Sequence, residues 1–374
     1  MRKKGKTGVC KAAQLRDGSR HPFGMLGGVT ALGGGELEVY RQIRNAVPIL
    51  DAAIGKLVRL TGGFTVSCGN RKAERELERF LKTVNAGRGQ VGLESFLAAF
   101  LQSMLVYGRA VGEMVVGGNE ITAVLWGDVT KLYVQEGTSA MEFAFGQWQD
   151  GEVKIFPRQN LILFAAWNPD EENPYGASVF RSMPFLVDVL LKIYSTIGTN
   201  WERAGNVRYS VVYKPQDEAG RIDAQERSEQ IASQWSQAMQ ESRHGVVRDF
   251  VAVGDVEIKV IGADGPVLDA AVPVRQLLEQ LVAKTGLPPF LLGLSWSSTE
   301  RMSAQQADLL TSELWALRRA VEPVLLRICT LWLRLHGCGC APEIVWDDIS
   351  LQDLVEEAQA DLYRARTEQL RKGT

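Results

Sequence analysis

The segment GLPPFLLGLSWSSTERM, from Gly286 to Met302, separates two stretches of sequence that both have the periodicity of a helix. From Ser303 onward, apolar residues recur at three- and four-residue steps, which is typical of a long helix with one wide apolar face. Ser303 is a suitable N-cap, and Pro323 is expected to kink the helix because proline removes a backbone donor. Upstream, residues 272–284 predict a second helix. The apolar face of the long helix comprises Leu309, Leu310, Leu314, Leu317, Val321, Val324, Leu325, Ile328, Leu331, Trp332 and Leu335.

The composition is that of an ordinary globular protein. The 374 residues suffice for two or three domains, and 45% hydrophobic with 23% charged residues is the usual balance. A formal net charge of −2 gives no sign of a protein that coats nucleic acid. No apolar run approaches the length of a membrane span, so we expect none. Five scattered cysteines favour a reducing compartment over a disulfide framework.

The first half of the chain predicts helices followed by a small sheet. Residues 37–60 have a helical periodicity that Pro48 interrupts, and residues 71–84 and 93–107 predict two more helices. Short alternating segments with glycine-containing turns between them predict strands at 65–67, 111–116, 123–126, 131–134, 142–147, 153–156 and 161–166. Helices and strands grouped in this way are typical of an α+β domain.

A group of short elements then lies between two long helices. The first long helix is predicted at residues 178–204, with an apolar stripe, and the second is the helix at 272–284. The elements between them are strands at 207–213, 250–253 and 257–261 and a polar helix at 223–239. After the long C-terminal helix, residues 343–346 predict a strand and 351–370 a charged helix.

Three short motifs in this order of elements resemble bacteriophage portal proteins, over roughly residues 37–370. The first is Tyr107-Gly-Arg-Ala110, and the second is Asn173-Pro-Tyr-Gly-Ala-Ser178, just before the first long helix. The third is Gly286-Leu-Pro-Pro-Phe-Leu-Leu-Gly293. A Pro-Pro turn alone is an ordinary link between helices, so the resemblance depends on its position, the polar loop and the long helix together. The turn positions of these motifs include Asn173, Pro174, Tyr175, Gly176, Gly286, Pro288, Pro289 and Gly293.

The resemblance implies an α+β, portal-like fold with an α/β wing, two long stem helices, a small α/β clip insert and a long kinked wing helix. The implied parts, in chain order, are a flexible N-terminal arm at 1–38, the first part of the wing at 39–175, stem helix 1 at 176–205, the clip at 206–264, stem helix 2 at 265–290, a tunnel loop at 291–302, the long wing helix and strand at 303–350, and a C-terminal helix or short crown at 351–374.

In such a protein the tunnel loop and the stem helices would line a channel for DNA. Arg301 is then the expected phosphate contact, and Trp296 and Met302 would pack the loop, although Glu300 and Arg301 could equally pair with each other at the helix start. The residues of the expected DNA-channel loop are Ser295, Trp296, Ser297, Ser298, Thr299, Glu300, Arg301 and Met302. Further candidate contacts with DNA or partners in or near the clip are Arg203, Arg208, Arg221, Arg243 and Arg248, for which a charged solvent-exposed face is the alternative.

The resemblance also implies the partners and the location of the protein. Portal proteins form a closed ring of about twelve copies with head-to-tail interfaces. Their partners are the large terminase subunit, a head–tail adaptor, the major capsid and scaffold proteins, and double-stranded DNA bound without sequence specificity. The expected location is the portal vertex of the virion, and the host cytoplasm during assembly. No membrane is expected among the partners.

Other kinds of site find little support in the residues. Asp170, Glu171 and Glu172 could bind a hard cation, but three consecutive acids in a proline-flanked loop are more typical of a solvated turn. His336, Cys338 and Cys340, with Cys329, lack the spacing of a zinc site. No nucleophile elbow or complete nucleotide-binding loop occurs, so we expect no catalytic residues, no metal and no cofactor.

Two alternatives to a portal protein remain open at the level of the sequence. One is another head–tail connector or capsid structural protein, although such proteins are usually shorter and lack an insert between two helices. The other is an unrecognised enzyme that uses a cysteine or a histidine.

Overall fold

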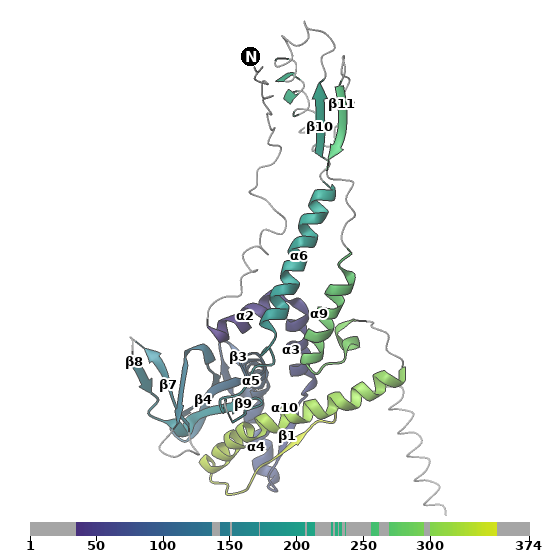
Figure 1. Cartoon of the computed structure of the whole chain (residues 1–374). Helices are drawn as coiled ribbons and strands as arrows, with labels where there is room; N and C mark the ends of the chain where they lie inside the picture. Colours follow the sequence, from purple (N-terminus) through teal and green to yellow (C-terminus); the bar gives the residue numbers. More distant parts are fainter. Residues whose placement is uncertain are drawn as a thin grey trace, which may run out of the picture. The chain divides into compact units, whose positions relative to one another are not determined.

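The computed structural model describes residues 35–136, 143–149, 152–171, 173–205, 208–213, 256–261, 269–294 and 300–349, together with 226, 229–230, 232–233 and 236. The chain divides into two units, and the smaller one holds the described residues within Leu190–Val272. The larger unit holds those within Ala31–Val189 and Pro273–Thr374. Figure 1 labels most of the helices and strands described below.

The larger unit begins with two helices that a proline separates. Helix α2 spans Glu36–Ala46 and helix α3 spans Pro48–Leu60, with Pro48 in the first turn of α3. Val47 between them is extended, because the residue before a proline is disfavoured in the helical conformation. The predicted interruption at Pro48 is confirmed. One face of α3 is buried through Leu50 and Ile54.

Helix α5 is the centre of this unit. It spans Leu93–Tyr107, as the sequence predicts, and buries apolar side chains around most of its circumference, including Phe96 and Phe100. A helix that is apolar on nearly all sides belongs in the interior of a domain. Helix α4 (Arg71–Thr83) precedes it, capped by the side chain of Asn70. The short hairpin of β2 (Asn85–Gly87) and β3 (Gln90–Val91) joins the two helices and was not predicted.

Two sheets follow α5 along the chain. The five-stranded sheet has the order β3-β2-β5-β4-β9 and contains β4 (Arg109–Gly117), β5 (Glu120–Trp126) and β9 (Ile162–Ala166). Its strands are antiparallel except that β2 runs parallel to β5. The three-stranded sheet contains β6 (Leu132–Glu136), β7 (Phe143–Gln149) and β8 (Glu152–Ile155). Short 3-10 turns, η1 (Val129–Lys131) and η2 (Gln159–Leu161), lead into β6 and β9.

The rest of the chain supplies long helices and two small sheets. In the larger unit, β1 (Phe64–Ser67) pairs with β12 (Glu343–Trp346) in an antiparallel register that sets Phe64 opposite Trp346. In the smaller unit, β10 (Arg208–Tyr213) pairs with β11 (Val256–Ile261). The helices are α6 (Pro184–Gly205), α9 (Ala271–Lys284) and α10 (Glu300–Leu335), with the 3-10 turn η3 (Pro289–Leu292) between the last two.

The predicted α+β class is confirmed, and two details of the long helix are wrong. Helix α10 already includes Glu300, so Ser303 lies inside the helix and is not its N-cap. Glu300, Arg301 and Met302 are themselves good helix formers, which explains the earlier start. Leu309 is 70% exposed whereas Leu310 is 1% exposed. Consecutive helical residues point about 100° apart, and at this position Leu310 faces the core whereas Leu309 does not.

The helix continues through Pro323, and the predicted kink stays a prediction. No helix in the described part of the chain combines the length and the apolarity that crossing a bilayer requires. Several predicted elements lie wholly or largely outside the described residues. These are the arm up to residue 34, the helix at 223–239, the strand at 250–253, the helix at 351–370 and the loop at 295–299.

Candidate functional site

The turn after α9 has a defined backbone built on Thr285 and Gly286. Thr285 is buried, and its Oγ1 donates to the carbonyl of Val282 at 2.7 Å and accepts from the amide of Leu287 at 3.3 Å. Gly286 has a φ of +73°, the left-handed conformation that commonly ends a helix and that glycine adopts without strain. The turn therefore ends α9 and directs the chain toward the two prolines.

The Pro288–Pro289 step forms a compact 3-10 turn. The amides of Leu291 and Gly293 donate to the carbonyls of Pro288 and Phe290, each at 3.1 Å. Leu287 and Pro288 are buried, so one side of the turn is packed, and η3 contacts α3. Gly293 closes the turn with a φ of +76° and has open space around it. The loop at 295–299 therefore begins from a packed turn.

A buried arginine fixes the middle of α10. Arg318 is 1% exposed, and its Nε donates to the carbonyl of Thr61, at the end of α3, at 2.9 Å. Its guanidinium carbon lies 4.9 Å from the ring centre of Trp315 and 5.1 Å from that of Trp346, distances at which cation–π attraction is significant. Residues from α3, α10 and β12 are therefore joined at one point of the larger unit.

Burial lowers the pKa of Arg318, while the carboxylates of Asp347 and Asp348 act in the opposite direction. Its Nη1 is buried without a hydrogen-bond partner among the described residues. A buried charge of this kind is costly unless it is compensated, so the two indole rings and the Thr61 carbonyl are needed where they are. The arginine holds the middle of α10 on the rest of the unit.

Two of the sequence motifs cross each other at Gly108 and Gly176. A Cβ on Gly108 would lie 2.6 Å from the carbonyl carbon of Ala177, and a Cβ on Gly176 would overlap the carbonyl oxygen of Gly108. Both glycines also have positive φ, of +78° and +94°. The amide of Trp167 donates to the carbonyl of Gly108 at 2.7 Å, which draws the two segments together. Only glycine fits at either position.

The segment that follows Gly176 supplies hydrogen-bond donors to the last carbonyl groups of α5. Ser178 is buried, and its Oγ donates to the carbonyl of Val106 at 2.5 Å and accepts from the amide of Phe180 at 2.9 Å. The amide of Val179 donates to the carbonyl of Leu105 at 3.0 Å. The last carbonyls of a helix lack partners within the helix, so this segment serves as a cap supplied from far along the sequence. It positions the start of α6 at Pro184.

The acidic turn before this crossing is structural. The side chain of Asp170 accepts from the amide of Asn173 at 2.6 Å and from Arg181 at 3.0 Å. The Asn173 amide group donates to the carbonyl of Gly176 at 2.8 Å. Among the described residues, no group of three or more His, Cys, Asp or Glu side chains is placed to hold a metal ion. These hydrogen bonds of Asp170 and Asn173 are those of a turn, as the sequence predicts for this segment.

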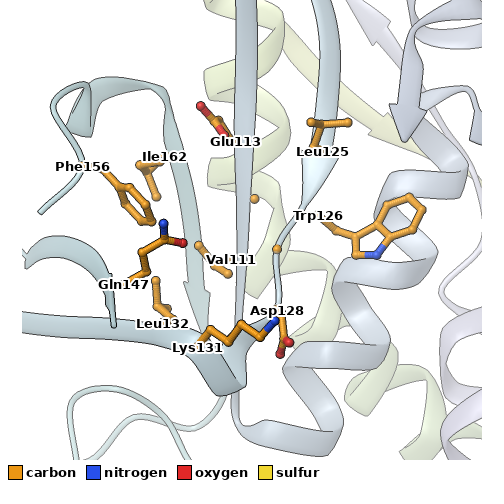
Figure 2. A pocket seen from close by; sticks show the side chains of 12 residues that line it. Val111, Glu113, Leu125, Trp126, Asp128, Lys131, Leu132, Gln147, Phe156 and Ile162 are labelled. Carbon is orange, nitrogen blue, oxygen red and sulfur yellow. The ribbon is translucent and has the colours of Figure 1, made fainter. Parts of the chain in front are cut away.

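A pocket of about 270 Å³ lies between the two sheets of the larger unit (Figure 2). The sheets pack against each other beside it, through Val111, Val129, Phe145 and Ile162. Its polar residues include Glu113, Asp128 and Lys131. The carboxylate of Asp128 accepts from the amide and the hydroxyl of Thr130 at 3.0 and 2.6 Å, which is the pattern of a turn cap. No serine, cysteine or histidine is among the lining residues.

Cys329, Cys338 and Cys340 and the nearby His336 lie in three different surroundings. Cys329 is buried, and burial raises the pKa of its thiol to about 12, which leaves it protonated. Cys338 and Cys340 are joined by a disulfide that spans a single intervening residue. It does not connect distant parts of the chain, as a disulfide framework would. His336 stacks on the ring of Trp332, with centroids 3.9 Å apart, and its Nδ1 lies 2.9 Å from that residue's carbonyl oxygen.

The residues predicted for the DNA channel are only partly described. Ser295, Trp296, Ser297, Ser298 and Thr299 lie outside the described residues, whereas Glu300, Arg301 and Met302 form the first turn of α10 and not a loop.

Of the arginines predicted near the clip, Arg203 lies in α6 and Arg208 in β10. Arg221, Arg243 and Arg248 lie outside the described residues. Of the motifs singled out in the sequence, the structure brings two together, at Gly108 and Gly176.

Arg318 is the structural residue that sequence reasoning missed. It lies at the helical spacing of Leu314, Leu317 and Val321, on the face predicted to be apolar. A charged residue on such a face signals either a buried charge with partners or a break in the stripe. The signal was present, but the partners Thr61 and Trp346 are distant in the sequence.

Comparison with known proteins finds solved structures of similar fold but no similar sequence. No protein-family model and no curated protein sequence matches the chain. Among solved structures, a chain from the neck of an empty gene transfer agent (GTA) particle, computed with C6 symmetry, is similar with a TM-score of 0.66 and 16% identity. The similarity covers 90% of this chain and 90% of that chain.

A chain from the neck of the native GTA particle, computed with C12 symmetry, is similar with a TM-score of 0.61 and 17% identity, over 92% and 93% of the two chains. The protein has the fold of this neck chain. A portal protein of an HK97-family phage from Corynebacterium diphtheriae is also similar, with a TM-score of 0.46 and 11% identity over 82% and 94% of the two chains. The resemblance predicted from the sequence is confirmed at the level of the fold.

Proposed function

We propose that this chain is a phage portal protein, whose copies form a ring at one vertex of a capsid so that double-stranded DNA passes through the centre. The observation that carries the proposal is the similarity of fold to a neck chain over nine-tenths of both chains. Because the similarity extends over nearly the whole length, it includes the complete arrangement of helices and sheets and not one shared motif. It also favours a particle component of this kind over a shorter connector protein.

The ring would be closed and head-to-tail. A heterologous interface closes when the rotation between neighbours divides a full turn, and about twelve copies would correspond to the C12 symmetry of the similar particle neck. The larger unit would then be the wing, α6 and α9 the stem helices, and β10 with β11 part of the clip. The virion is the corresponding location.

The channel would be lined by the stem helices and by the segment from η3 to the first turn of α10. A duplex must slide through without sticking, so contacts should be few, aimed at phosphates and indifferent to sequence. Arg301 is the residue we propose for the phosphate contact, with Trp296 and Met302 packing the loop. The packed η3 turn at one end and the Arg318 anchor on α10 would hold the loop between two fixed points.

The protein would act mechanically, and the energy for packaging would come from a separate motor. The large terminase subunit and later a head–tail adaptor are proposed to dock on the clip, near Arg203, Arg208, Arg221, Arg243 and Arg248. The major capsid and scaffold proteins would contact the wing. We propose no catalytic role for this chain.

Electron microscopy of the purified full-length chain, with native mass spectrometry alongside, tests the ring. We expect closed rings of about twelve copies with a central hole. Because assembly can require other particle proteins, the chain should also be co-expressed with scaffold and capsid proteins. A compact small oligomer without a hole in both preparations would overturn the proposal.

Variants of the loop test the channel. Deletion of residues 295–299 should leave rings intact and reduce DNA packaging or retention, and Arg301→Ala should do so to a smaller extent. Arg75→Ala removes an exposed arginine from α4, in the body of the larger unit, and is the matched control for lost charge. Normal packaging by intact rings that carry the deletion would refute the role assigned to the loop.

A further inference from the structure

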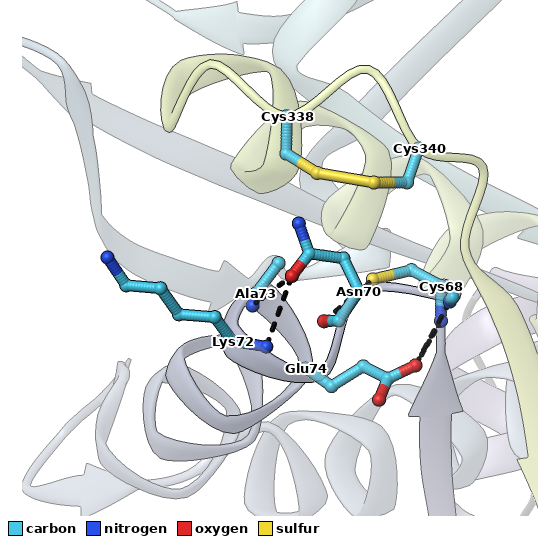
Figure 3. Close-up of a disulfide and its surroundings, with 8 residues drawn as sticks. Cys68, Asn70, Lys72, Ala73, Glu74, Cys338 and Cys340 are labelled. Carbon is cyan, nitrogen blue, oxygen red and sulfur yellow. Dashed lines mark hydrogen bonds between the residues drawn. A yellow bond between two sulfur atoms is a disulfide. The ribbon is translucent and has the colours of Figure 1, made fainter.

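Three cysteines approach one another at the end of α10. Cys338 and Cys340 form a disulfide in the loop between α10 and β12. Cys68 is a free thiol in the turn between β1 and α4. Figure 3 shows Cys68 on the side of that turn that faces the disulfide, with Asn70 beside it. The pairing of β1 with β12 holds the two segments side by side.

The register of this pairing indicates which sulfur is within reach of Cys68. The last pair of the two strands is Ser67 with Glu343, and continuing this register by one step would set Cys68 level with Pro342 and make Cys340 its diagonal neighbour. Diagonal neighbours of antiparallel strands have Cα atoms about 7–8 Å apart, and a disulfide requires about 4.4–6.8 Å. A small backbone movement therefore brings Cys68 to Cys340, whereas Cys338 lies two residues further along.

Both segments are held in place independently of the sulfurs. The amide of Cys68 donates to Oε1 of Glu74 at 2.8 Å. On the other side, the amide of Cys338 donates to the carbonyl of Leu333 at 2.9 Å, and Asn119 donates to the carbonyl of Leu335 at 2.5 Å. All three cysteines are half-buried, so solvent and small thiols can reach them. This end of the larger unit brings thiol and disulfide together without burying them.

We infer that Cys68, Cys338 and Cys340 form a thiol–disulfide exchange site. The Cys68 thiol loses its proton, and the thiolate attacks Sγ of Cys340. The Cys68–Cys340 bond forms, the Cys338–Cys340 bond breaks, and Cys338 leaves as a thiolate that takes up a proton. One disulfide is present before and after the step, so the exchange needs no oxidant.

The two bonds differ in what they do to the chain. A bond between Cys338 and Cys340 spans one intervening residue and hardly restricts the unfolded chain. A bond between Cys68 and Cys340 joins segments far apart in the sequence, and the stabilisation from a disulfide grows with the length of the loop that it closes. The exchange converts a local bond into a covalent tie between the β1–α4 turn and the end of α10. Oxidising surroundings, such as those outside a cell, maintain that tie.

The variant Cys338→Ser tests the inference in the full-length chain, because it leaves Cys340 without its local partner. The folded variant is incubated with oxidised glutathione, alkylated, cleaved with trypsin and analysed by mass spectrometry. Cys68 and Cys340 then lie in the peptides Leu60–Arg71 and Leu335–Arg364. We expect loss of both alkylated peptides and gain of one disulfide-linked pair, together with a rise in the thermal midpoint that dithiothreitol reverses.

The double variant Cys68→Ser, Cys338→Ser is the control, and its thermal midpoint should not respond to oxidation. Separate glutathione adducts on Cys68 and Cys340, or a bond from Cys68 to Cys10, would overturn the inference. If Cys338→Ser does not fold, the wild-type chain decides the question after brief exposure to substoichiometric dithiothreitol. A linked peptide pair with alkylated Cys338 supports the exchange, and the Cys338–Cys340 bond alone refutes it.

Discussion

The glycines of the Gly108–Gly176 crossing and those of the turn from Gly286 to Gly293 all have positive φ, but their surroundings differ. At the crossing, added Cβ atoms would collide with backbone atoms of the partner segment. At the turn, the atoms nearest to a Cβ on Gly286 would belong to the side chain of Glu313, at 3.6 Å, and no atom of the described residues lies within 4 Å of a Cβ on Gly293. The crossing needs glycine for packing as well as conformation, whereas the turn needs it for conformation alone.

This difference indicates that the glycines of the crossing hold two packed segments together, whereas those of the turn lie at a less crowded part of the surface. Backbone segments that approach within contact distance cannot move apart without losing the hydrogen bonds that join them, such as the bond from Trp167 to Gly108. Open space around Gly293 leaves that face of the turn accessible to another molecule. Under the proposed function, the crossing holds the wing together, and the turn starts the loop that faces the channel.

Gly176→Ala should have the largest effect on stability. The methyl group would overlap the Gly108 carbonyl and lie 2.9 Å from the Trp167 amide nitrogen, so the crossing must open. We expect the free energy of unfolding to fall by at least about 4 kcal/mol, measured by urea denaturation and by the yield of folded protein. Gly118→Ala, with a φ of +63° and open space, is the control that changes only the backbone preference. Equal losses of unfolding free energy in the two variants would show that the close packing at Gly176 adds nothing to the cost of its backbone conformation.

Ser178→Ala and Thr285→Val compare one buried hydroxyl from each region. Loss of the Ser178 hydroxyl leaves the carbonyl of Val106 and the amide of Phe180 without that partner, at a cost of about 1–3 kcal/mol. Thr285 makes one bond of 2.7 Å and a weaker one of 3.3 Å, so its loss should cost about 1 kcal/mol. Chemical denaturation of both variants gives the two values. A larger loss at Thr285 would show that the turn is the more tightly held region.

Gly293→Ala should have a much smaller effect than Gly176→Ala. No atom lies near the added methyl group, so only the left-handed backbone opposes it, at about 1–2 kcal/mol. Gly293→Asn should cost less, because asparagine tolerates this conformation. Gly339→Ala has open space and no positive φ, and it should leave the thermal midpoint unchanged. A loss for Gly293→Ala as large as that for Gly176→Ala would contradict the open surroundings of the turn.

Local signals in the sequence predicted the elements well. Pro48 ends one helix and begins the next, and the apolar periodicity of residues 93–107 predicted the limits of α5. Such features depend on backbone chemistry and on spacing within a few residues. The β2–β3 hairpin was missed because its strands have three and two residues, too few for alternation to be recognised.

Contacts between distant segments could not be predicted in the same way. The sequence indicated both glycine motifs, but nothing in either one specified that Gly108 and Gly176 touch. The burial of Arg318 depends on Thr61 and Trp346, which belong to opposite ends of the larger unit's sequence. Leu309 and Leu310 are chemically identical, and only the direction of the core decides which is buried.

The pairing of β1 with β12 has a consequence for synthesis on the ribosome. Residues 64–67 are made long before their partners at 343–346. At about 5–20 residues per second, β1 waits for roughly 15–55 s with its hydrogen-bonding edge unpaired. The β1–β12 sheet of the larger unit therefore cannot form until residues 343–346 have left the ribosome.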